Sequence, residues 1–222
     1  MTDEKTNLKE RQIVYPGQVL AEGSAPGPNC YKEGGKIISL VSGLANIGKD
    51  RVSVIPFKGK YTPKAGDHVI GVLVEDLGSV WLVDIQSPYM GILREERDSN
   101  RRGRDRRGRQ PDLKVGGIVS TKIISVDEVK EPQLIRPWTL EDGYIIKVDP
   151  KKIPRVIGKN KSMLNIIKDK TKSNVVVGQN GLIWIKAGDT DLAVEAIRQI
   201  EAEAHTRGLT DRISEMLDNK TK

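Results

Sequence analysis

Two segments rich in arginine and lysine hold the residues of this sequence that are best suited to chemistry. Residues 100–110 read NRRGRDRRGRQ and contain six arginines and one aspartate. Residues 147–172 contain nine lysines and arginines and two aspartates. Neutralising phosphates supplies most of the non-specific affinity of proteins for nucleic acid. With a formal net charge of +7 for the whole chain, the two segments predict a polyanionic partner, although both would also fit solvated loops.

The arginine segment predicts a contact surface for single-stranded nucleic acid, because guanidinium groups on a flexible segment hold phosphates without reading sequence. Like charges interspersed with glycine bury too little apolar area to fold, so we expect a mobile loop over residues 95–110. The alternatives are a solvated insertion and a run of the nuclear-localisation type. The predicted contact residues are Arg101, Arg102, Arg104, Arg106, Arg107 and Arg109.

The second basic segment contains the sequence IGKNKS, residues 157–162, between two expected helical stretches. A KH domain clamps backbone nucleotides with a GXXG loop at such a place, where the following helix offers free N–H groups. This sequence keeps Gly158 but has Lys161 where the second glycine belongs. We expect a bulkier, more cationic loop that contacts RNA phosphates; an ordinary turn with solvated lysines is the alternative. The predicted contacts are Lys152, Arg155, Gly158, Lys159, Asn160 and Lys161.

A third motif, Gly178-Gln179-Asn180-Gly181, lies between two apolar runs. An Asn-Gly pair in this setting predicts a β-hairpin with a type I′ turn, in which both residues have positive φ. By itself this motif indicates a turn rather than a binding site.

Catalytic constellations are absent from the sequence. It contains no Walker loop, no GxSxG and no HExxH. The densest acidic cluster, Glu95-Glu96-Arg97-Asp98, adjoins the arginine segment. One cysteine, Cys30, and two histidines, His68 and His205, are too few for a Cys/His zinc cluster or a disulfide framework. We therefore expect a protein that is not an enzyme and has no metal or cofactor.

The composition predicts a soluble chain of several small modules. Of 222 residues, 30% are charged, 37% hydrophobic and only 4% aromatic. No run approaches the ~18 apolar residues of a transmembrane helix, and the charged N-terminus lacks the apolar region of a signal peptide. We expect a cytoplasmic protein without a membrane partner.

The pattern of apolar residues predicts a mostly β fold with an α+β C-terminal part. Short alternating runs bounded by Gly, Asn and Pro predict an N-terminal β-domain over residues 1–62, which we expect to be a docking surface. Five short strands over residues 63–137 fit a Greek-key barrel of the OB type. Trp81 is in phase with Val83 and Ile85 and should lie in the core, and we expect Trp138 and Trp184 to be packed as well.

From Gly143 the periodicity changes to the order β-α-α-β-β-α, which is the order of a KH domain, over residues 143–208. The last helix of this unit should have Asp189 or Thr190 as its N-cap and Gly208 as its C′ residue. A tail helix is expected over residues 209–222.

Taken together, these motifs resemble one family. The segments PGQVLAEG and GGKIISLVSG, the barrel sequence GDHVIGVLVEDLGSVWLVDIQSPYMGIL, and IGKNKSM followed by GQNG are similar to the archaeal-type exosome RNA-binding cap subunits, the ribosomal-RNA-processing protein four family. The resemblance covers essentially the whole chain. The family carries a GxNG signature, matched by Gly178, Gln179, Asn180 and Gly181, and typically lacks an intact GXXG loop.

The resemblance implies an S1-type barrel followed by a KH domain in a non-catalytic subunit that binds single-stranded RNA. It implies three such caps on a hexameric ring of RNase PH-like subunits, with the N-terminal domain docked on the ring and the barrels around the entry pore. The caps would guide RNA 3′ ends to phosphorolytic, 3′-to-5′ degrading sites in the ring. The alternatives are a free-standing S1/KH transcription or translation factor and, less favoured, a nuclease.

Overall fold

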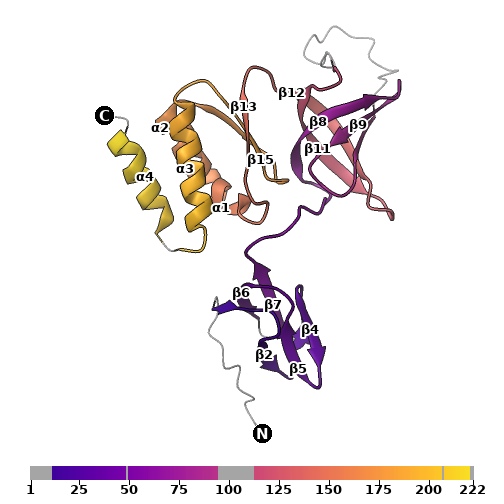
Figure 1. The fold of residues 1–222 in the computed structure, drawn as a ribbon, viewed down its shortest axis with the longest axis vertical. Coiled ribbons are helices and arrows are strands. Elements are labelled where there is room, and N and C mark those ends of the chain that lie inside the picture. Colours follow the sequence, from indigo (N-terminus) through magenta and orange to yellow (C-terminus); the bar gives the residue numbers. More distant parts are fainter. Residues whose placement is uncertain (1–11, 49, 95–112, 207, 221–222) are drawn as a thin grey trace. The chain divides into compact units, whose positions relative to one another are not determined.

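The computed structural model describes residues 12–48, 50–94, 113–206 and 208–220. Contacts between Cα atoms divide the chain into two compact units, Met1–Gly59 and Lys60–Lys222 (Figure 1). No helix among the described residues is long and apolar enough to span a membrane.

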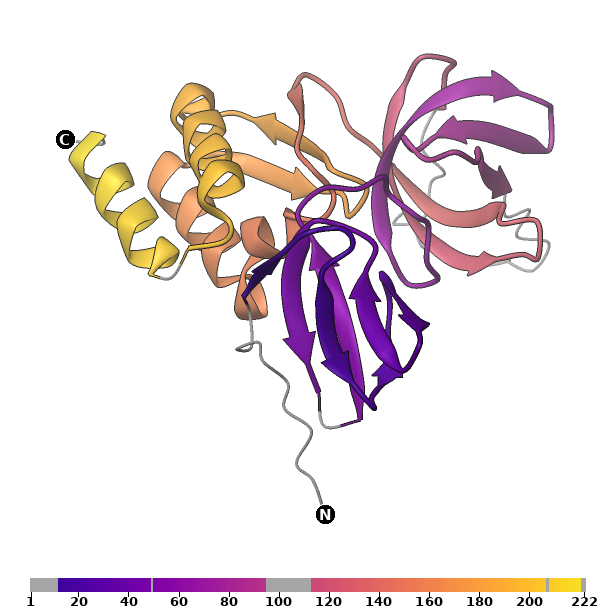
Figure 2. The ribbon, with the colours of Figure 1, turned by 60° about the horizontal axis from the view of Figure 1, so that its bottom comes forward.

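The N-terminal unit consists of short strands in two sheets that share one core (Figure 2). The first sheet has the order β1-β6-β7-β3. The second has the order β2-β5-β4. The strands are β1 (Ile13–Val14), β2 (Val19–Glu22), β3 (Ala25–Pro26), β4 (Cys30–Glu33), β5 (Lys36–Ser39), β6 (Gly43–Ile47) and β7 (Arg51–Pro56). Because Val14 and Val54 of the first sheet and Leu20 and Ile37 of the second belong to the same buried cluster, the two sheets pack face to face.

The described residues of the second unit include a closed barrel of five strands in the order β10-β12-β11-β8-β9, which confirms the predicted OB-type barrel. Strand β10 pairs with β12 in parallel to close it. The strands are β8 (His68–Asp76), β9 (Val80–Asp84), β10 (Gly91–Arg94), β11 (Ile118–Val126) and β12 (Pro132–Thr139). Alternate residues point inward, and Trp81, Val83 and Ile85 are buried as predicted. Tyr61 also belongs to this core, ahead of the first strand.

The prediction that Trp138 is packed is wrong. Its side chain is 73% exposed, whereas the sequence pattern placed it in the core. The register of β11 with β12 shifts between Ser120 and Lys122, and Arg136 has a φ of 52°. A bulge of this kind exchanges the inward and outward faces beyond it. Leu134 before the bulge therefore points inward and Trp138 after it points to solvent.

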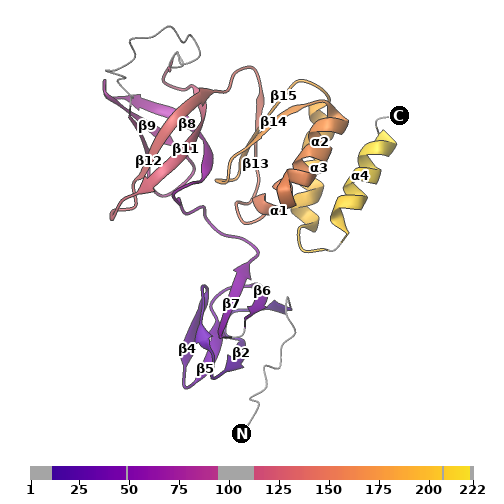
Figure 3. The same cartoon turned by 180° about the vertical axis from the view of Figure 1, so that it is seen from behind.

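The KH order β-α-α-β-β-α is confirmed. The elements are β13 (Tyr144–Lys147), α1 (Ile153–Ile157), the short 3-10 helix η2 (Lys159–Lys161), α2 (Ser162–Thr171), β14 (Asn174–Val177), β15 (Leu182–Lys186) and α3 (Thr190–Glu203). The sheet is antiparallel with β15 in its centre, and the helices cover one of its faces (Figure 3). The Asp189 side chain accepts a hydrogen bond from Leu192 N, which confirms Asp189 as the N-cap of α3.

The tail helix α4 (Leu209–Lys220) is part of the KH core. Leu209, Ile213 and Leu217 recur every four residues along one helix face and are buried in the same cluster as the residues of α2 and α3. Gly208 was expected to follow α3, but α3 ends at Glu203 and Gly208 immediately precedes α4. The end of α3 is closed instead by Thr206, whose N–H and hydroxyl both donate to Glu203 O.

Candidate nucleic-acid interface

The Gly-Gln-Asn-Gly motif forms the turn between β14 and β15, but not as the predicted type I′ turn. Gly181 N donates to Gly178 O at 3.1 Å, and Gly178 N donates to Leu182 O at 2.8 Å. Gly181 has a φ of +91°, whereas the φ of Asn180 is not positive. This is the pattern of a turn centred on Gln179 and Asn180 and followed by a left-handed glycine. The prediction of positive φ at Asn180 is therefore wrong.

This turn attaches the KH unit to the barrel. Asn180 is only 2% exposed, and its Nδ2 donates to Ile70 O at 2.6 Å and to Ile85 O at 2.8 Å. Its Oδ1 accepts from Ile70 N at 3.2 Å. The neighbouring Gln179 exchanges two hydrogen bonds with the backbone of His68, at 2.8 and 2.9 Å. Gly178, Asn180 and Gly181 are thus buried where the turn contacts β8, whereas Gln179 is exposed.

Apolar side chains surround the same junction. Ile70 of the barrel packs with Leu140, Leu182 and Trp184 in a separate buried cluster, which confirms that Trp184 is packed. A Cβ atom at Gly178 would collide with Asn180 Oδ1 and would lie 2.9 Å from Ile70 N. Only glycine at this position lets the turn approach the barrel so closely.

The predicted RNA-contacting loop is exposed and lies between α1 and α2. Gly158 has a φ of 74°, and a Cβ atom there would lie 2.7 Å from Met163 N, so a side chain does not fit. Asn160 and Lys161 are left-handed, with φ of 52° and 63°. Lys161 therefore adopts the conformation for which glycine is favoured. Lys159, Asn160 and Lys161 are solvent-exposed and close together.

Lys152 and Arg155 differ from each other in their surroundings. Lys152 Nζ donates to Glu201 O at 2.8 Å, so its charge is held against the C-terminal part of α3. Arg155 is exposed in the last turn of α1. Of the cationic residues predicted in this segment, Arg155, Lys159 and Lys161 are thus exposed to solvent, and Lys152 is partly buried and bound to the backbone of α3.

Lys168 belongs to the same basic surface and was not among the predicted contacts. Burial, followed by the charge of the nearby Lys161, lowers the pKa of Lys168. Lys161 is the left-handed N-cap residue of α2 and Lys168 lies within that helix, near enough for the charge of Lys161 to act on it. The available signal in the sequence was that Lys168 belongs to the same basic segment, residues 147–172.

Two family models match this chain, in the same order as the N-terminal unit and the KH domain of the structure. Residues 11–58 match the family model described as the exosome RNA binding protein RRP4 N-terminal domain, and residues 143–191 match a KH domain model. The exosome complex component Rrp4 of Methanothermobacter thermautotrophicus is 40% identical over 96% of this chain and 70% of its own length. That of Pyrococcus furiosus is 41% identical over 96% of this chain and 85% of its own length. The chain belongs to the Rrp4 family.

A solved structure agrees with this membership of the Rrp4 family. A crystal structure described as an exosome complex RNA-binding protein aligns with a TM-score of 0.60 and 34% identity. The alignment covers 73% of this chain and 97% of that chain. The resemblance seen in the sequence motifs is therefore confirmed.

The remaining predicted contacts of this Rrp4-family chain are Arg101, Arg102, Arg104, Arg106, Arg107 and Arg109. They lie outside the described residues, in the part of the sequence between Arg94 at the end of β10 and Leu113. Within the described part of the chain, no group of three or more His, Cys, Asp or Glu side chains is arranged to hold a metal ion.

Proposed function

We propose that this Rrp4-family chain is the RNA-binding cap subunit of an exosome. It captures single-stranded RNA and guides RNA 3′ ends into a ring of degrading subunits. The observation that carries the proposal is 40% identity over 96% of the chain to a protein named exosome complex component Rrp4. The order of β-domain, OB-type barrel and KH domain supports it, because both OB and KH modules bind nucleic acid.

The finer features of the proposal follow from the family. Three copies of the chain sit on a hexameric ring of RNase PH-like subunits in the cytoplasm, and phosphorolysis takes place in the ring, not in the cap. The N-terminal unit supplies the contact with the ring. Its described residues contain no concentrated basic segment, which favours a protein partner over RNA.

RNA is held through its phosphates. We assign the contact to the arginines of residues 101–109 together with Arg155, Lys159, Asn160 and Lys161 on the exposed loop of the KH domain. Phosphate contacts position an RNA strand without specifying its sequence. A processive degrading complex requires this kind of binding, since every sequence must pass.

Reconstitution tests the proposal. The full-length chain is mixed with RNase PH-like ring subunits of the same source, and the mass of the complex and the phosphate-dependent decay of labelled RNA are measured. We expect co-elution with a mass increase of three caps and faster decay at limiting RNA. The chain without the ring should leave RNA intact. If the chain remains free of the ring and alone binds RNA, it is a free-standing factor; if it degrades RNA and loses this activity when one of its own acids is mutated, it is a nuclease.

A further inference from the structure

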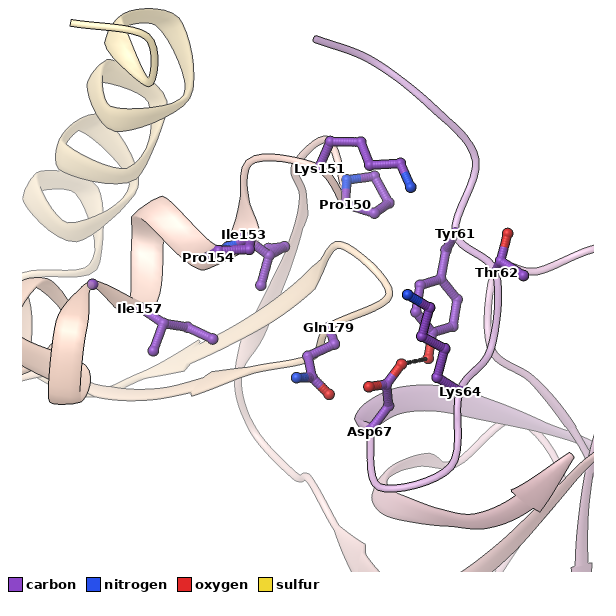
Figure 4. Close-up of a pocket in the computed structure, with 11 residues that line it drawn as sticks. Tyr61, Thr62, Lys64, Asp67, Pro150, Lys151, Ile153, Pro154, Ile157 and Gln179 are labelled. Carbon is purple, nitrogen blue, oxygen red and sulfur yellow. Dashed lines mark hydrogen bonds between the residues drawn. The ribbon is translucent and has the colours of Figure 1, made fainter. Parts of the chain in front are cut away.

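A cavity of about 410 Å³ lies where the segment leading into the barrel faces the KH domain (Figure 4). One wall is formed by Tyr61, Thr62, Lys64 and Asp67, and the other by residues 150–158 and Gln179. Small-molecule sites in proteins have volumes of roughly 300–1,000 Å³. The cavity is therefore large enough for one nucleotide.

The barrel wall of the cavity is held in place by hydrogen bonds. Tyr61 is 6% exposed, and its hydroxyl donates to Asp67 Oδ2 at 2.7 Å. Burial, followed by the hydrogen bond to the Asp67 carboxylate, raises the pKa of Tyr61, so the phenol remains a donor. Asp67 N in turn donates to Lys64 O at 3.2 Å.

The KH wall is equally fixed. Gln179 Oε1 accepts from His68 N at 2.9 Å, which directs the amide of Gln179 to the edge of the cavity. Ile153 is 1% exposed and anchors the first turn of α1 in the KH core. Because both walls are built from ordered backbone and buried anchors, a ligand would find the site already formed.

The polar groups of the cavity are mostly donors. The ammonium groups of Lys64 and Lys151 extend toward it from opposite walls (Figure 4). Among the described residues, neither lysine forms an ion pair, and Gln179 Nε2 has no hydrogen-bond acceptor. Asp67 is the one acid in the described lining, and its carboxylate already accepts from Tyr61. An anion is the complementary ligand.

The apolar groups of the cavity indicate that its anionic ligand also has an apolar part. Pro150, Pro154 and Ile157 form an apolar surface beside the two lysines, with the buried Ile153 beneath it. An apolar surface next to cations suits a nucleotide, whose base is flat and whose phosphate is charged. The free amide N–H groups of Gln179 are placed to donate to a base edge.

The cavity is continuous with the exposed loop of the KH domain, because Gly158 both lines the cavity and begins that loop. We propose that the cavity binds one nucleotide of a single-stranded RNA whose backbone continues over Lys159 and Lys161. Lys64 and Lys151 hold the phosphate, and the base lies on the apolar surface. This assignment rests on the proposed RNA-binding function and adds a nucleotide site between the barrel and the KH domain.

The test uses the full-length chain and single-stranded RNA oligonucleotides that contain 4-thiouridine. After photo-crosslinking, mass spectrometry should find crosslinks in the peptides of residues 61–67 or 150–158. The double variant Lys64→Ala/Lys151→Ala should lose these crosslinks and at least fivefold in RNA affinity at low salt. The slope of log K against log salt should fall by about 0.7, the value for one single-strand phosphate.

The control is the double variant Lys32→Ala/Lys130→Ala, which removes two exposed lysines that do not line the cavity. It should bind RNA within twofold of the unsubstituted chain, and both variants should unfold at an unchanged temperature. Unchanged affinity of the cavity variant, with crosslinks confined to other peptides, overturns the nucleotide site and leaves the proposed function intact. A chain that binds no RNA at all overturns both. Displacement of RNA from the cavity peptides by a poly-glutamate peptide at equal concentration would identify an acidic protein segment as the occupant instead.

Discussion

The side chain of Asn180 pairs with both backbone polar groups of Ile70, accepting from its N–H at 3.2 Å and donating to its carbonyl at 2.6 Å. It thereby takes the place of a neighbouring β-strand at this point of β8. The two residues are 110 positions apart in sequence, and their contact determines how the KH sheet meets the barrel.

Replacing Asn180 should therefore destabilise the second unit. Asn180→Ala leaves the buried carbonyls of Ile70 and Ile85 without their donor, and each unsatisfied buried group costs roughly 1–3 kcal/mol. We expect a loss of about 2–4 kcal/mol in the free energy of unfolding, measured by urea denaturation. Asn165→Ala, on the exposed face of α2, is the control and should change stability by less than about 0.5 kcal/mol. Equal effects of the two substitutions would contradict the structural role of Asn180.

The two tryptophans of the barrel strands should behave in opposite ways. Trp81 is 6% exposed and Trp138 is 73% exposed. Trp81→Ala removes a core side chain and should cost about 3–5 kcal/mol. Trp138→Ala removes a side chain that is already in water and should cost less than about 0.5 kcal/mol in the isolated chain. Denaturation monitored by far-UV circular dichroism compares them, and a large loss for Trp138→Ala would show that this residue is packed after all.

Lys161→Gly should increase stability, because Lys161 has a φ of 63°. A residue other than glycine in this region costs roughly 1–2 kcal/mol, part of which is offset by the greater freedom of glycine when unfolded. We expect a gain of up to about 1 kcal/mol in thermal or urea unfolding. Lys161→Ala is the control, since it removes the same charge but keeps the strain. Both variants should weaken RNA binding alike, and a stability gain in both would assign the effect to charge repulsion with Lys168.

The arginine segment should determine the salt dependence of RNA binding. Replacing Arg101, Arg102, Arg104, Arg106, Arg107 and Arg109 with Ser removes six positive charges. Each lost single-strand phosphate contact reduces the slope of log K against log salt by ~0.7. With three or four arginines bound at once, the slope should fall by roughly two to three and affinity at low salt by more than tenfold. Sequence preference should not change. An unchanged slope would leave the lysine-rich segment as the RNA contact.

The N-terminal unit should be necessary for assembly but not for RNA binding. Lys60–Lys222 forms a compact unit with its own buried clusters in the barrel and the KH domain. A chain that lacks residues 1–59 should therefore remain folded and bind RNA, while failing to co-elute with the ring. Size-exclusion chromatography with light scattering measures both. Normal ring association of the truncated chain would place the docking surface elsewhere.

Local patterns predicted most of the fold. Alternation of apolar residues was sufficient for the barrel strands and for the burial of Trp81, because inward and outward positions alternate strictly along a regular strand. The period of the C-terminal segment predicted α1 to α3. The N-cap of α3 was narrowed to Asp189 or Thr190, because a cap acts over only three residues along the chain, and the structure shows that it is Asp189. The KH-type loop with Gly158 and Lys161 could also be predicted, because its motif lies within a few consecutive residues.

Contacts between distant segments decided the rest. A bulge at Arg136, seen in the pairing of β12 with β11, turned Trp138 outward. The ammonium group of Lys152 donates a hydrogen bond to the carbonyl oxygen of Glu201 in α3, and Lys64 and Lys151 line the same cavity. Neither relationship can be read from the local sequence. The Gly-Gln-Asn-Gly turn has the same local sequence whether it is exposed or buried. Only β8, which offers Ile70 as a partner, makes Asn180 a structural residue, and no local pattern contains a partner 110 residues away.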